Sequence, residues 1–161
     1  IKFQEKLVEV FQKGEDAVER WNYLSVFFIA SGIIQALSLK SLVQGYYGEL
    51  YTDLIDNALE LLKKLKDADL EEKNRKKVFD YLLKTYEKEH LQNLELHDDF
   101  LFIACDFVSD EKDKDNIIEL EKNYQDDGYY DTKMEREVVA WQLIRKLKGE
   151  EAWEAYRDDH L

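Results

Sequence analysis

Apolar residues recur every three or four positions along most of this chain, which is the spacing of one face of an α-helix. Connections between the periodic segments are short, so successive helices should lie side by side and antiparallel. We therefore expect an all-α chain of antiparallel helical hairpins. The pattern predicts helices over 1–13, 21–39, 50–66, 71–88, 96–108, 116–124 and 132–148, and from 150 onward, with 109–115 as a charged loop.

The segment 21–39 differs from the others because it contains no charged residue. A membrane span needs about twenty predominantly apolar residues, so the length of this segment comes close. Asn22, Gln35 and three serines interrupt it, and the rest of the chain is very polar. A helix buried by its neighbours is therefore favoured over one that contacts a membrane. Within it, Ala30-Ser31-Gly32 should let another helix approach closely.

Turn-forming residues are scarce, with no proline and six glycines among 161 residues. Proline removes a backbone donor and clashes inside a helix, so its absence suits a chain that is helical nearly throughout. β-Sandwiches and barrels need turn residues at short, regular intervals, which this sequence does not supply. Composition thus supports the all-α fold class.

One short pattern occurs twice, at 13–21 (KGEDAVERW) and at 148–156 (KGEEAWEAY), with five identical positions. A glycine followed by acids suits a left-handed helix cap and the start of the next helix. We therefore predict hairpin corners at Gly14 and Gly149. The distance between the copies fits several units of roughly 34 to 45 residues. This favours a right-handed α-α superhelix of repeats, with a compact orthogonal bundle as the alternative.

These corners are loosely similar to tetratricopeptide-type α-hairpins, although the glycine-to-alanine spacing is shorter and that family's proline is missing. Residues 51–62 and 140–156 more closely resemble the helical-repeat region that accompanies SWIM-type zinc fingers in bacterial proteins. The resemblance covers the second two-thirds of the chain and implies a scaffold role. It implies no metal site, because Cys105 is the only cysteine.

Charge divides the chain into two parts. Residues 1–48 hold five acids and five bases, so 49–161 carries the whole net charge of −13. Such a field repels phosphate backbones and disfavours nucleic acid as a partner. It leaves a basic protein partner open, beside a merely solubilising role. We treat 1–161 as one all-helical domain, and expect it to be a piece of a longer protein because neither end has the residues of a natural start or stop.

Cys105 lies in the apolar run 100–108, which predicts a buried thiol. A nucleophilic cysteine needs an electropositive, accessible setting, and aspartates flank this one instead. A single cysteine also suits a reducing compartment such as the cytoplasm.

Three acidic pairs, two of which adjoin a histidine, form a pattern that suggests metal chemistry. Carboxylate and imidazole groups together can hold a divalent ion. A carboxylate–histidine metal-dependent hydrolase would then resemble an HD-type phosphohydrolase through His97-Asp98. Helix-start charges and turn residues explain the same pairs without a metal, and we favour that interpretation. We therefore expect no catalytic residue and no cofactor. The residues that a metal would use are His97, Asp98, Asp126, Asp127 and His160.

Tyrosines gather at two predicted turns, and aromatic residues in loops anchor protein partners at low entropic cost. They also pack as lids over hairpins. The candidate interaction residues are Tyr46, Tyr47, Tyr51, Tyr129 and Tyr130. The predicted function is a protein–protein interaction or scaffold segment without catalysis. The alternative is an acidic immunity or inhibitor-type protein that masks a basic partner, and a metal-dependent hydrolase comes third.

Overall fold

A computed structural model describes residues 2–20, 22–37, 48–88, 91, 97–126 and 133–160, and over these residues the protein is all-helical, without strands. The prediction of an all-α chain of helical hairpins is confirmed. The α-helices, with a 3-10 turn after the fifth of them, are α1 (Lys2–Glu19), α2 (Tyr23–Leu37), α4 (Gly48–Lys63), α5 (Glu72–Tyr86), α6 (His97–Ala104), η2 (Cys105–Phe107), α7 (Glu111–Asp126), α8 (Lys133–Lys148) and α9 (Glu150–His160).

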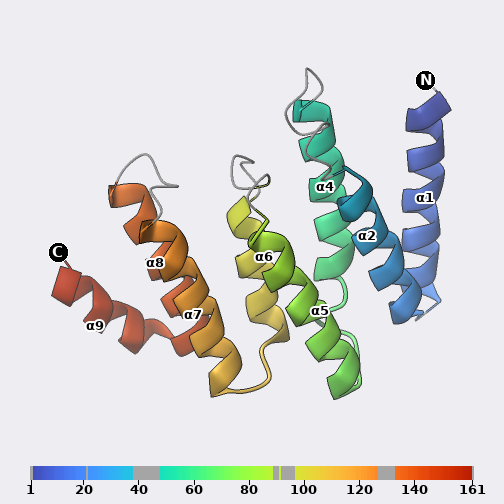
Figure 1. Cartoon of the computed structure of the whole chain (residues 1–161). Coiled ribbons are helices and arrows are strands. Elements are labelled where there is room, and N and C mark those ends of the chain that lie inside the picture. The colour runs from blue at the N-terminus through green and yellow to red at the C-terminus, as the bar shows by residue number, and fades with distance from the viewer. Residues whose placement is uncertain are drawn as a thin grey trace.

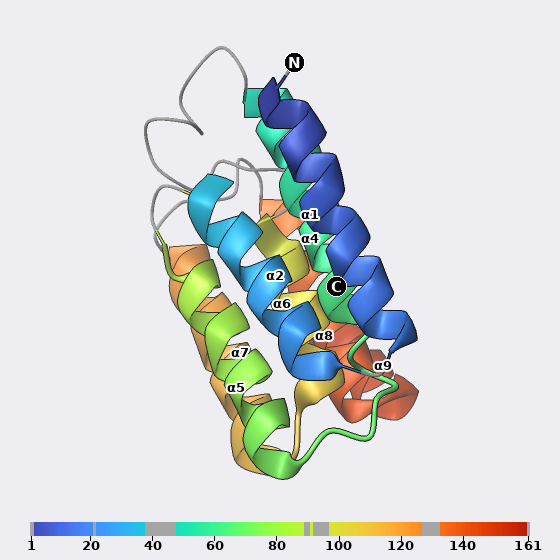
Figure 2. The ribbon, with the colours of Figure 1, turned by 90° about the vertical axis from the view of Figure 1, so that its right-hand side faces the viewer.

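The helices form a two-layered row that runs from α1 at one end to α9 at the other (Figure 1). One layer contains α1, α4, α6 and α8, which all run in one direction, and the other contains α2, α5 and α7, which run in the opposite direction (Figure 2). The two layers pack on each other, with α2 against α4 and α5 against α6. Consecutive helices from α1 to α8 are thus antiparallel, as short connections require, whereas α9 is set at an angle to α8 (Figure 1).

The core lies between the two layers and is almost entirely aliphatic and aromatic. From α4, the apolar stripe Ile55, Leu59 and Leu62 is fully buried against α2. From α5 and α6, the largest buried side chains are Phe79, Tyr86 and Phe100. Each completely buried side chain of this size contributes about 1.5–3 kcal/mol relative to an exposed one. Helices that are individually marginal are held by this shared burial.

The two copies of the KGE pattern adopt different structures. Gly149 has φ +89° and separates α8 from α9, which confirms the predicted corner. At Gly14 the prediction was wrong, because α1 continues through it to Glu19. A Cβ atom on Gly14 would lie 2.8 Å from Leu61 Cδ1 of α4. Gly14 is therefore a point of close helix approach, and its lack of a side chain is what makes room for Leu61.

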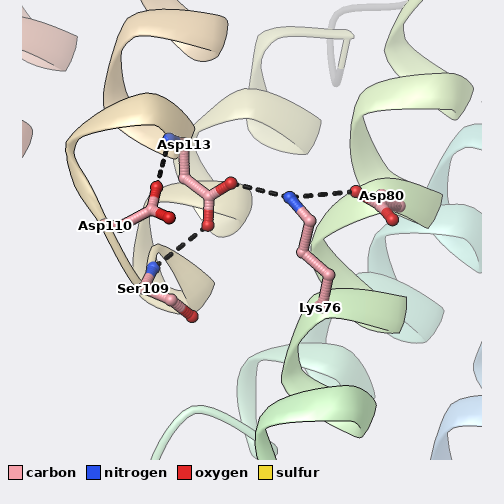
Figure 3. Close-up of polar contacts among 5 residues, drawn as sticks. All are labelled: Lys76, Asp80, Ser109, Asp110 and Asp113. Atoms are coloured by element: carbon pink, nitrogen blue, oxygen red, sulfur yellow. Dashed lines mark hydrogen bonds and ion pairs between the residues drawn. The ribbon is translucent and has the colours of Figure 1, made fainter.

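Helix α7 begins at Glu111, whereas the sequence predicted a charged loop as far as residue 115. The side chain of Asp110 accepts a hydrogen bond from the backbone N–H of Asp113 at 2.9 Å, which is N-capping geometry. Asp113 is buried, and its carboxylate accepts from Lys76 Nζ of α5 at 2.6 Å and from Ser109 N at 3.2 Å (Figure 3). The charges that suggested a loop thus form a cap and a link between α5 and α7.

The uncharged helix α2 buries one face in the core, with Val26, Ala30 and Ile34 fully inaccessible. Among the described residues, no helix combines the length and apolar character needed to cross a membrane. Ala30 is completely buried, whereas at Gly32 a Cβ atom would meet no described residue within 4 Å, so no described helix of this chain approaches closely there.

Candidate interaction surface

The apolar surface that stands out on the described part of the molecule lies on α2. Phe28 is 56% exposed and Leu24 is 46% exposed, and the two residues are one helical turn apart. Single exposed apolar residues are ordinary, whereas two neighbouring large ones on a helix without charges form a patch. The exposed face of α2 continues through Gly32 and Gln35, so it remains uncharged along its length.

Helix α5 lies beside α2 in the same layer (Figure 2). Lys73, Lys77 and Lys84 are separated by four and seven positions, so they share one face of α5, and all three side chains are exposed. Asp80 is on the same side, but Lys76 Nζ lies 3.3 Å from its carboxylate. The surface that α5 presents next to α2 is therefore positive, although the chain as a whole is strongly acidic.

Tyr81 joins the two helices by a hydrogen bond and a ring contact. Tyr81 Oη of α5 donates to the carbonyl oxygen of Ser31 on α2 at 3.2 Å. The Tyr81 ring packs edge-on against Phe27, with centroids 5.6 Å apart. Burial raises the pKa of Tyr81 to about 12, so its hydroxyl stays protonated and remains a donor at neutral pH. The side chains of Phe27 and Tyr81 thus pack between α2 and α5 beneath the exposed residues, and we call this pair the floor of the surface. Its contacts hold the two helices together.

Lys77 connects the floor with the exposed patch. Its Nζ lies 4.3 Å from the centroid of Phe28 and 5.2 Å from that of Phe27. A cation over an aromatic face is attracted by the ring quadrupole, so the ammonium group is held beside the exposed ring. Below it, Leu24, Leu70 and Lys77 contribute to the lining of a small cavity of about 10 Å³. We call this surface, made by Leu24, Phe28, Gly32, Lys73, Lys77 and Lys84, the α2–α5 face.

His97, a candidate metal ligand, has a structural environment. Its side chain is completely buried and stacks on the ring of Tyr86, with centroids 4.1 Å apart. Nε2–H donates to the carbonyl oxygen of Tyr86 at 2.8 Å. Burial lowers the pKa of His97 to about 4, which keeps the imidazole neutral at physiological pH. Nε2 of His97 is thus occupied by a hydrogen bond to the backbone.

Asp98 lies beside this histidine, with Oδ1 3.9 Å from Nδ1 of His97, and it is partly exposed. Within the described part of the chain, no three His, Cys, Asp or Glu side chains converge on a point that would suit a metal ion. The pairing of His97 with Asp98 that the sequence suggested is therefore present as neighbours, without a third ligand among those residues. Asp127, and the side chains of Asp126 and His160, lie outside the described residues.

The predicted tyrosine anchors are not placed by the structure: Tyr46, Tyr47, Tyr129 and Tyr130, and the side chain of Tyr51, lie outside the described residues. The sequence analysis missed Leu24, Phe28 and the three lysines of α5. The sequence did contain a signal for each set: the apolar residues lie at i and i+4 on a charge-free helix, and the lysines lie at i, i+4 and i+11, so each set shares one face of its helix. The sequence pattern did not indicate that these two helix faces lie next to each other.

Cys105, for which the sequence predicted a buried thiol, is partly buried. Its Sγ donates to the carbonyl oxygen of Leu101 at 3.2 Å, and burial raises the pKa of the thiol to about 12. Almost no thiolate is therefore present at neutral pH, and the thiolate is the reactive form.

Comparison with protein-family models, curated proteins and solved structures finds no match.

Proposed function

We propose that this chain is a protein-binding module and that its binding surface is the α2–α5 face. The observation that carries the proposal is the exposure of Phe28 and Leu24, at 56% and 46%, on the floor that Tyr81 and Phe27 build. Exposed aromatic groups that are already held in place lose little conformational freedom on binding, and such residues dominate binding energy at protein interfaces.

The arrangement of helices supports a scaffold role. Like-directed helices in each layer give an extended surface, and arrays of this kind bind partners along such a surface. We include in the proposal that the hairpins are related as helical repeats of the tetratricopeptide-like type, in a right-handed superhelix. The single, protonated thiol of Cys105 fits the cytoplasm as the compartment.

The proposal assigns no catalytic step and no cofactor to the chain. His97, the titratable group that would be needed for a carboxylate–histidine centre, is buried, neutral and bonded to the backbone. The second ring nitrogen would have to share an ion with other ligands, and within the described part of the chain no third His, Cys, Asp or Glu side chain converges with His97 and Asp98.

An acidic inhibitor that masks a basic partner remains the alternative, and it requires unpaired acids on one continuous patch. In the described residues several acids are instead paired with bases from other elements of the fold. Examples are Glu15 with Lys64 at 2.6 Å and Asp106 with Lys146 at 3.0 Å. Paired carboxylates contribute less to a steering field, so the binding-module proposal is the better supported one.

The proposal is tested by selecting binders from a randomised peptide library displayed on phage, with the intact chain as bait. A selected peptide is then measured by fluorescence anisotropy against Phe28→Ser. Loss of the buried part of a phenylalanine corresponds to about 1–2 kcal/mol, which weakens binding roughly 5- to 30-fold. Val8→Ser is the matched control, because Val8 is 67% exposed and belongs to α1, which contributes no residue to the α2–α5 face. Equal affinities for both variants, or no enriched peptide, would refute the proposal.

A further inference from the structure

The local charge of the α2–α5 face is opposite to that of the whole chain. The net charge is −13, but on the α5 side of α2 the exposed lysines Lys73, Lys77 and Lys84 supply positive charge. On the α1 side, Lys13 and Asp16 lie near Ser25 of α2 and carry opposite charges. Helix α2 adds no charge of either sign. A partner that approaches this face therefore meets a positive, partly apolar surface on an otherwise negative molecule.

The three lysines are also not neutralised by neighbours. Ion pairs of the described lysines involve positions 63, 64, 76, 114 and 146, and none involves Lys73, Lys77 or Lys84. The one acid among them, Asp80, is turned toward Lys76, which in turn contacts Asp113 (Figure 3). The lysines are thus available to pair with carboxylates that do not belong to this chain.

The dimensions of the face suit one more helix. Lys73 to Lys84 and Leu24 to Gln35 each span eleven residues, or about 16 Å at the helical rise. The exposed apolar residues of α2 are one turn apart, so a partner helix with apolar residues at i and i+4 would match them. At Gly32 a Cβ atom would meet none of the described residues within 4 Å, which leaves room on their side for another backbone to approach.

We propose that the α2–α5 face binds an acidic amphipathic helix of a partner protein, whose apolar side packs on Phe28 and Leu24 and whose carboxylates pair with Lys73, Lys77 and Lys84. Lys77 is placed for both contacts, because its ammonium group lies 4.3 Å from the ring centroid of Phe28. A carboxylate there would lie beside the apolar contact, where solvent is excluded and the ion pair is strengthened. This inference rests on the proposed function and specifies the class of partner.

The experiment uses the peptides selected on the intact chain. We expect enriched sequences to carry net negative charge, with apolar residues at helical spacing, and to gain helical circular dichroism on binding. A peptide from this set should bind the double variant Lys77→Glu, Lys84→Glu at least tenfold more weakly. A version of the peptide with each acid replaced by lysine should bind that double variant more tightly than the wild type.

The matched control is Lys112→Glu, Lys122→Glu on α7, which changes the net charge by the same amount at exposed positions away from α2. We expect its affinity to change less than threefold. Equal loss in the two double variants would show that only the overall field matters, and would overturn the inference. Enriched peptides that need Phe28 but are basic, uncharged or bound in an extended form would also overturn it, while leaving the proposed function intact. Peptide binding that is unchanged by Phe28→Ser would overturn both this inference and the proposed function.

Discussion

Burial of His97 should make this protein less stable at mildly acidic pH than at neutral pH. The imidazole is completely buried and its pKa is about 4, compared with 6.5 in the unfolded chain. As the pH falls below 6.5 the unfolded state binds a proton that the folded state does not, so the free energy of unfolding decreases. The decrease continues until about pH 4, where both states are protonated. The two pKa values correspond to about 3 kcal/mol in total, of which about 2 kcal/mol is lost between pH 7 and pH 5.

The assay is urea unfolding followed by circular dichroism at pH 7 and pH 5, for the wild type and for His97→Gln. Glutamine can still donate to the carbonyl oxygen of Tyr86 but does not titrate. We expect the variant to be less stable at pH 7, because the ring stacking is lost, and to lose about 2 kcal/mol less than the wild type on acidification. Titration of all other groups is common to both proteins and cancels in the difference. A gap between the two proteins that stays constant from pH 7 to pH 5 would show that His97 titrates normally, and would refute the buried, neutral assignment.

Other predictions concern backbone and charge. Gly149→Ala should cost about 1 kcal/mol, because φ is positive there, and Gly149→Asn should cost less, as measured by thermal unfolding. Gly14→Leu should cost about 3 kcal/mol through overpacking against α4, and stability unchanged from the wild type would mean that α1 and α4 are not in contact there. In urea unfolding, Asp113→Ala should cost about 2 kcal/mol, because a buried carboxylate with two donors is removed. Its control Asp80→Ala, which removes an exposed partner of Lys76, should cost less than about 0.5 kcal/mol.

The candidate site was only partly predictable from the sequence. The lysines of α5 and the apolar pair of α2 can each be assigned to one helical face, because helical spacing is a local property. The contact between the faces depends on Tyr81 reaching Ser31, fifty positions earlier in the chain. A pair so distant in sequence leaves no periodic signal in either helix. His97 shows the same limit, because its neighbours in sequence suggested a metal ligand, whereas its burial and the carbonyl of Tyr86 decide its state.

The sequence by itself determined that the chain is helical, where most helices lie, and that consecutive helices from α1 to α8 are antiparallel. These follow from spacing, missing prolines and short connections, which act within a few residues. Only the tertiary structure decided what Gly14 and Gly149 do, although their surroundings in sequence are nearly the same. At Gly149 the chain turns, whereas α1 continues past Gly14, buries Ala17 and places Glu15 2.6 Å from Lys64 of the connection after α4. Burial and pairing with a distant helix outweigh the roughly 1 kcal/mol that glycine costs inside a helix, and no local pattern records that gain.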